Sequence, residues 1–178
     1  MNSDREISPP SIRVAAVGIL TALTVVIGYI RVPLPATNGI FTLADVAIFC
    51  AAFLLGPFSA AIAGGLGTAL IDIIGGTAQY APTSFVVHGL EGLLAGLIAM
   101  AASGRTSVVV LWVLAGLVGT VTMAGGYLVA ETLFYGGFAT ATTEIVFNVA
   151  QGAVGAVGGA LLAFAVRRAY PPFTRLRW

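Results

Sequence analysis

The segment TEIVFNVAQG, residues 143–152, places three polar side chains in an otherwise apolar stretch near the C-terminus. Glu144, Asn148 and Gln151 follow the spacing i, i+4, i+7, so at about 100° per residue they share one narrow face of a helix. Such a polar stripe marks either the outer face of a soluble helix or the inward face of a membrane helix.

Composition decides between these two environments. Of the 178 residues, 58% are hydrophobic and only 8% are charged, whereas a soluble domain carries about 25% charged residues. The sequence therefore predicts an integral membrane protein, and its length suits one domain. With a net charge of +1, the chain has no basic surface for nucleic acid.

Several catalytic and metal-binding motifs are missing from the sequence. There is no lysine, and a phosphate-binding loop needs one, so the chain is not an ATPase of that kind. One histidine, one cysteine and no H-E-x-x-H motif make a conventional zinc site unexpected. No G-x-S-x-G occurs, and Cys50 alone forms no intrachain disulfide. We expect no cofactor, no metal and no catalytic residue.

Six apolar segments, separated by glycine, proline and polar breaks, predict an all-α bundle of six transmembrane helices. They cover about residues 12–30, 42–55, 58–74, 83–102, 107–133 and 142–166, and the breaks at 75–82 and 134–141 are the most distinct. We expect a membrane domain over 12–168 between an N-terminal tail, 1–11, and a C-terminal tail, 169–178.

The second and third segments are short against the roughly 20 residues that cross a bilayer. One long helix kinked at Gly56-Pro57 is therefore an alternative, and it would give five spans. The arginines favour six spans, because positive residues prefer the cytoplasm. Six spans leave Arg31 alone on the outer side and place both termini in the cytoplasm. The arginines then grouped on the cytoplasmic side are Arg5, Arg13, Arg105, Arg167, Arg168, Arg175 and Arg177.

Polar residues recur at helical spacing in other segments. Ser84, His88 and Glu91 repeat the i, i+4, i+7 pattern, and Tyr127 and Glu131 are four residues apart, as are Thr68 and Asp72. Ionisable groups in a membrane are costly, so they face the bundle interior or a watery cavity. Under six spans these groups, together with Asp45, lie in the outer half of the bilayer. The sequence therefore predicts a cavity that opens to the outside.

The candidate ligand-binding residues combine carboxylates, amides and aromatic rings, which suit a planar nitrogen heterocycle with donor groups. They are Tyr80, Ser84, His88, Glu91, Tyr127, Glu131, Glu144, Asn148 and Gln151. Further aromatic walls are expected from Phe85, Phe134 and Tyr135. A structural reading stays open: carboxylates near helix ends can simply reach water, and His88–Glu91 can be one local hydrogen-bonded pair.

Two other features of the sequence are a small-residue helix face and a proline-containing loop. Ala15, Gly18 and Ala22 form a small-residue face on the first segment, which suits close helix approach either inside the bundle or against a partner. The segment 30–42 carries Pro33 and Pro35 and then the turn signal Asn38-Gly39. It is either an ordinary connector or a lid over the cavity.

Three blocks resemble the substrate-binding S component of an energy-coupling factor (ECF) vitamin transporter. They are FTLADVAIFCAAFLLGPFSAAIAGG (41–65), LIDIIGGTAQYAPTSFVVHGLEGLLAG (70–96) and TEIVFNVAQGAVGAVGG (143–159). The resemblance covers about residues 12–165, and its most specific parts are the ADVAIF…LLGP block, the D-x-x-x-G-x-x-x-Y-A-P block and the E-x-x-x-N-x-x-Q stripe.

The resemblance implies six helices with cytoplasmic termini in the plasma membrane of a prokaryote. It implies capture of a B-vitamin or precursor in an outer pocket roofed by the first loop. Partners would be a membrane T component, docked on Ala15, Gly18 and Ala22, and two cytoplasmic ATPases that hydrolyse ATP, so the chain itself is not an enzyme. The family often has lysine where this sequence has His88.

The pocket residues suit hydroxymethylpyrimidine, thiamine or pyridoxine, with the larger riboflavin as the main competitor. Two rival functions remain open. One is a self-sufficient proton-coupled carrier with His88 and Glu91 as the proton relay. The other is a membrane enzyme using Asp45, Asp72, Glu131 and Glu144 as acid–base groups.

Overall fold

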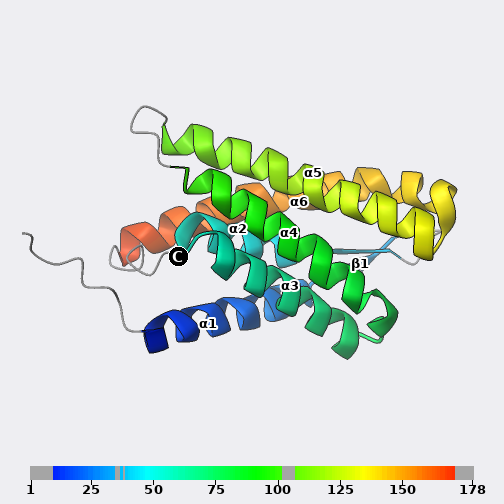
Figure 1. Cartoon of the computed structure of the whole chain (residues 1–178), viewed down its shortest axis with the longest axis horizontal. Coiled ribbons are helices and arrows are strands. Elements are labelled where there is room, and N and C mark those ends of the chain that lie inside the picture. The colour runs from blue at the N-terminus through cyan, green and yellow to red at the C-terminus, as the bar shows by residue number, and fades with distance from the viewer. Residues whose placement is uncertain (1–9, 35–36, 38, 102–106, 171–178) are drawn as a thin grey trace, which may run out of the picture.

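The structure, a computed structural model, describes residues 10–34, 37, 39–101 and 107–170. The helices are α1 (Pro10–Gly28), α2 (Ala44–Leu54), α3 (Pro57–Ile74), α4 (Ala81–Ala99), α5 (Val108–Phe134) and α6 (Gly137–Ala169). The short elements are β1 (Arg31–Pro33), β2 (Ile40–Thr42) and the 3₁₀ turn η1 (Ala78–Tyr80). Figure 1 shows an elongated helical bundle with the small β1–β2 hairpin at one end. The start of α1 and the end of α6 lie together at the opposite end (Figure 1).

Most helices of the bundle suit a membrane. Among the described residues, five helices are long and apolar enough to cross one: α1, α3, α4 together with η1, α5 and α6. The remaining helix, α2, has 11 residues and is about 16 Å long at 1.5 Å per residue, well short of the roughly 30 Å hydrocarbon core. The expected all-α, multi-pass membrane fold is confirmed at this level.

α2 and α3 are two helices that fold back on each other, not one kinked helix. Gly56 between them has φ 97°, a left-handed conformation that favours glycine. Pro57 then begins α3, where its missing N–H is not needed. At the far ends of the two helices, Ala44 and Ile71 both pack against Gly28 of α1. The kinked-helix alternative is therefore wrong.

The centre of the bundle is α2, which contacts α1, α3, α4 and α6. All of its residues except Val46 are buried. An apolar helix with no polar face is the type that occupies a protein core. Glycines on α6 allow the close packing: a Cβ at Gly159 would lie 2.6 Å from the Cβ of Phe49, and one at Gly155 would overlap Asp45. Small residues at helix contacts let the backbones approach in this way.

The observed helix ends differ from the predicted ones mainly at α6. It begins at Gly137, so most of the expected break at 134–141 is already helical. Threonines support this first part, because Thr140 donates to Gly136 O at 2.9 Å and Thr143 donates to Ala139 O at 3.0 Å. The expected tails 1–11 and 169–178 fall almost wholly outside the described residues, so their boundaries stay predictions.

Candidate functional site

A cavity of about 80 Å³ lies at the hairpin end of the bundle, among the hairpin, α3, α4, α5 and α6. Its lining residues are Arg31, Gly39, Ile40, Thr42, Thr68, Ile71, Asp72, Thr77, Tyr80, Ser84, His88, Tyr127, Glu131, Glu144, Asn148 and Gln151. Most of these side chains are polar, as expected for polar helix faces that turn away from lipid.

The structure brings the predicted ligand-binding side chains together around this cavity, with one exception. Those that line it are Tyr80, Ser84, His88, Tyr127, Glu131, Glu144, Asn148 and Gln151. The exception is Glu91, which is fully buried beside His88 and does not line the cavity. The periodicity identified the inward face of α4 but not how deep along that face the cavity reaches.

The polar stripe of α6 holds the hairpin over the cavity. Glu144 Oε1 accepts a hydrogen bond from Gly39 N at 3.1 Å, and Gln151 Oε1 accepts one from Thr42 N at 2.7 Å. Between them, the Asn148 amide lines the cavity and makes no hydrogen bond within the described part of the chain. Two members of the stripe therefore position the roof, while the third is available to a ligand.

The roof itself is the β1–β2 hairpin, where a connector or lid was expected over 30–42. Arg31 pairs with Thr42, and Pro33 pairs with Ile40. Gly39 lets the hairpin approach the Glu144 side chain closely, because a Cβ there would lie 2.6 Å from the Glu144 carboxyl carbon. Pro35 and Asn38 are outside the described residues. The hairpin is thus fastened to the cavity wall through backbone amides.

The wall made by α3 and α4 is a hydrogen-bonded network around Asp72. Its carboxylate accepts from Ser84 Oγ at 2.6 Å and from Thr77 Oγ1 at 3.0 Å. Ser84 Oγ also lies 2.7 Å from the Tyr127 hydroxyl of α5. These bonds fix the orientation of four cavity side chains, and pre-organised polar groups are typical of small-molecule sites.

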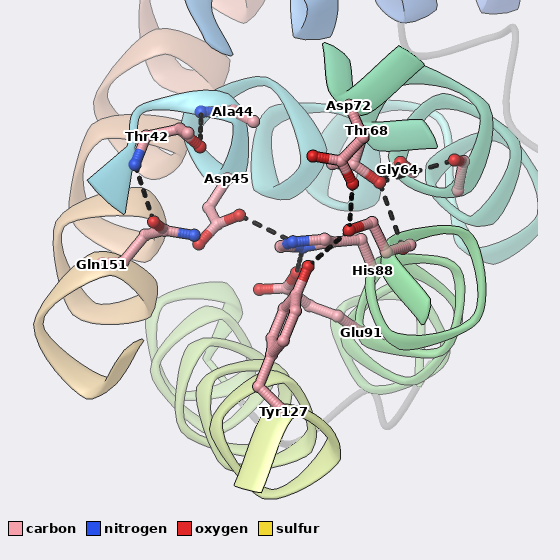
Figure 2. Close-up of polar contacts among 12 residues, drawn as sticks. Thr42, Ala44, Asp45, Gly64, Thr68, Asp72, His88, Glu91, Tyr127 and Gln151 are labelled. Carbon is pink, nitrogen blue, oxygen red and sulfur yellow. Dashed lines mark hydrogen bonds and ion pairs between the residues drawn. The ribbon is translucent and has the colours of Figure 1, made fainter. Parts of the chain in front are cut away.

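Beneath the cavity, His88 lies between two buried carboxylates. Its Nδ1 is 2.7 Å from Glu91 Oε2 and 3.3 Å from Asp45 Oδ1. Figure 2 shows Asp45, from α2, and Glu91, from α4, both pointing toward the His88 ring. Asp45, which the sequence analysis expected in the outer half of the bilayer, is 0% exposed. The reason is that α2 begins inside the bundle.

Arg31 is a cavity residue that the sequence analysis placed only on the outer side. Its Nη1 donates to Gly75 O at 3.3 Å, which ties β1 to the end of α3. Its guanidinium also lies 6.0 Å from the centre of the Tyr29 ring. No helical period could have found it, because it lies in a strand of three residues.

Aromatic side chains divide between the cavity and a neighbouring recess. The recess, of about 510 Å³, shares Tyr80 and Glu131 with the cavity and is also lined by Phe134 and Tyr135. The rings of Tyr80 and Tyr135 pack with their centres 4.3 Å apart. Phe85 lines neither space: it is 47% exposed and packs over Gly65. Its expected role as an aromatic wall is therefore not supported.

The small-residue face of α1 points away from the bundle. Ala15, Gly18 and Ala22 are all exposed, and a Cβ added at Gly18 would meet nothing within 4 Å among the described residues. Of the two interpretations left open by the sequence, packing inside this bundle is therefore excluded for this face.

Known proteins resemble this chain along most of its length. Residues 11–168 match the family described as ECF-type riboflavin transporter, S component. The chain is 35% identical over 158 residues to the thiamine precursor transporter HmpT of Lactococcus lactis subsp. cremoris, covering 88% of each chain. It is 30% identical over 151 residues to an uncharacterized protein, in the gap 3′ region, of Pyrococcus woesei, covering 85% of this chain and 98% of the relative. The resemblance found in the sequence motifs is thus confirmed, and the chain belongs to the S-component family of ECF-type riboflavin transporters.

Proposed function

We propose that this S component captures a single-ring nitrogen heterocycle of the thiamine-precursor type, such as hydroxymethylpyrimidine, from outside the cell. The observation that carries the proposal is the small cavity under the hairpin, which Asn148, Glu131 and Glu144 help to line. Carboxylate and amide oxygens accept hydrogen bonds from ring amino groups, and the Tyr80 and Tyr127 rings offer apolar faces for stacking. The 35% identity with a thiamine precursor transporter supports the same class.

The size of the cavity favours a ligand with one ring over a ligand with three fused rings. About 80 Å³ gives room for about five to eight water-sized groups. That matches one six-membered ring with small substituents. Riboflavin, the vitamin in the family description, has three fused rings and a ribityl chain, and it would require the hairpin or the Tyr80–Tyr135 pair to move. Thiamine and pyridoxine lie between these extremes.

The first experiment is mass spectrometry of small molecules released from the detergent-purified protein. We expect a stoichiometric pyrimidine or pyridine compound. Calorimetric titration of ligand-free protein should then give tighter binding of hydroxymethylpyrimidine than of riboflavin. Val146→Ala should bind like the original protein, since Val146 lies on the same helix as the polar stripe but is 69% exposed. Stoichiometric riboflavin would overturn the size argument.

For topology we propose six membrane segments with both termini in the cytoplasm of a prokaryotic cell. Arg13, Arg167 and Arg168 lie at the end of the bundle opposite the hairpin, and Arg31 lies at the hairpin end. The positive-inside rule then places the cavity outside. α2 would enter the membrane from outside and turn at Gly56. Cysteine labelling of whole cells tests this: Thr37→Cys should react with an impermeant reagent and Ser107→Cys should not.

For energy coupling we propose a T component and two ATPases as partners, with the exposed face Ala15, Gly18 and Ala22 as the docking surface. Family membership and the absence of a phosphate-binding loop support this arrangement. The rival proton-coupled carrier is favoured only by the 2.7 Å contact between His88 and Glu91. Uptake by the protein alone in liposomes, driven by a pH gradient, would replace our proposal with that rival.

A further inference from the structure

We propose that Asp45, His88 and Glu91 bind one divalent transition-metal ion, of the Zn²⁺ or Mn²⁺ class, directly beneath the ligand cavity. Each residue offers one potential ligand atom, and these atoms lie within 4.8 Å of one another. Figure 2 shows the three side chains converging from α2 and α4. Nothing in the family match or the named relatives assigns a metal to the chain.

Unpartnered oxygen atoms are the observation that points to a ligand. Asp45 is 0% exposed, and neither of its carboxylate oxygens has a hydrogen-bond partner among the described residues. Oε1 of the equally buried Glu91 is in the same state. His88 is the ion-pair partner of both carboxylates, but buried carboxylate oxygens that accept no hydrogen bond are unfavourable and are often satisfied by a metal.

The distances do not allow His88 alone to satisfy these atoms. Nδ1 of His88 bonds to Glu91 Oε2 at 2.7 Å, but its 3.3 Å approach to Asp45 Oδ1 lacks hydrogen-bond geometry. Nδ1 carries one hydrogen at most. A proton added to either carboxylate would supply one hydrogen-bond donor, so protonation is the competing explanation that the test must separate from metal binding.

A divalent ion accounts for both charge and coordination. Two carboxylates and a neutral imidazole carry a formal charge of −2, which one divalent cation neutralises. Carboxylate and imidazole together suit zinc, manganese or iron, with ligand distances of about 2.0–2.2 Å. The spacing of His88 and Glu91 at i, i+3 on an inward helix face is the kind that builds metal sites in helical bundles.

The surroundings of the cluster support a specific position for the ion. His88 also lines the cavity, so an open coordination position near its ring can face the ligand space. The Tyr127 ring of α5 lies edge-on to His88, with centres 5.6 Å apart. Gly155 of α6 provides the space that the Asp45 side chain occupies, since a Cβ there would overlap it. The ligand atoms thus come from α2 and α4, and α5 and α6 pack around them.

The test uses the full-length protein in detergent, with any affinity tag removed and metals stripped by a chelator. We expect calorimetry with Zn²⁺, and electron paramagnetic resonance with Mn²⁺, to show one ion per chain. Asp45→Asn and Glu91→Gln should each weaken metal binding by more than about 100-fold. Even mutation of a residue that only hydrogen-bonds to a metal ligand lowers metal affinity about 10–100-fold. Glu131→Gln removes a carboxylate at the same cavity but outside the cluster and should bind the ion as tightly as the original protein.

Thermal unfolding provides a second measurement that does not depend on vitamin binding. Added Zn²⁺ should raise the melting temperature of the original protein and of Glu131→Gln, but not that of Asp45→Asn, because only a specifically bound ion stabilises the folded state. If the original protein does not bind one metal ion per chain, the proposal is overturned, and protonation of the buried carboxylates explains the cluster instead. Equal weakening by Glu131→Gln and Asp45→Asn would also overturn it, because the ion would then be held by cavity carboxylates in general.

Discussion

α6 and α1 each carry a stripe of residues at helical spacing, and the two stripes face opposite environments. Glu144, Asn148 and Gln151 on α6 line the cavity, whereas Ala15 and Gly18 on α1 are exposed on the outside of the bundle. The α6 stripe has only one favourable direction, since a carboxylate facing lipid is costly. The α1 stripe has no such preference, so only the tertiary structure shows that it is free to receive a partner.

The largest expected effect comes from filling the α1 stripe. Ala22→Trp should lower association with the T component by about 100-fold, because overpacking a close helix contact costs up to about 3 kcal/mol. Ligand affinity should not change, since Ala22 is exposed and far from the cavity lining. Co-purification of the complex and calorimetry of the isolated S component measure the two effects separately.

Ile12→Trp is the matched control for the α1 stripe. Ile12 is 49% exposed on the same helix, and at about 100° per residue it lies about 60° from Ala15, 80° from Ala22 and 120° from Gly18. We expect the complex to form normally with this variant. If both tryptophans block the complex, or neither does, the stripe is not the docking surface.

A smaller effect is expected from shortening the α6 stripe. Glu144→Ala and Asn148→Ala should each weaken binding of hydroxymethylpyrimidine about 30-fold, since removing one partner leaves a buried polar group of the ligand without a hydrogen bond, at a cost of about 2 kcal/mol. Expression and helicity should be unchanged. Titration of both variants against Val146→Ala measures the difference, and unchanged affinity in both would remove the stripe from the ligand site.

The smallest effect is expected at the end of the same stripe. Gln151→Ala removes the 2.7 Å hydrogen bond to Thr42 N and should speed ligand release about fivefold, which corresponds to about 1 kcal/mol for a neutral hydrogen bond. Stopped-flow dissociation measures the rate. Slower association with unchanged release would indicate that Gln151 acts on the ligand and not on the hairpin.

The helices were predictable because each is a long apolar run that ends at a glycine, proline or polar break in the sequence. Gly56-Pro57 ends one helix and begins the next, and the structure places the turn there. The hairpin was not predicted, because strands of three residues are too short to show a period. The five membrane-embedded carboxylates do gather at one end of the bundle, but the sequence could not separate lining groups from buried ones. Glu91 and Asp45 are examples, since their depth depends on how α2 packs against α4.

The hairpin is fastened by a carboxylate that the proposed ligand would also use. Glu144 Oε1 accepts a hydrogen bond from Gly39 N, yet a carboxylate offers about four acceptor positions. An amino group of the ligand can therefore bind the same side chain while the hairpin stays fastened. One anion would then join roof and cargo, so that losing Glu144 would loosen both at once.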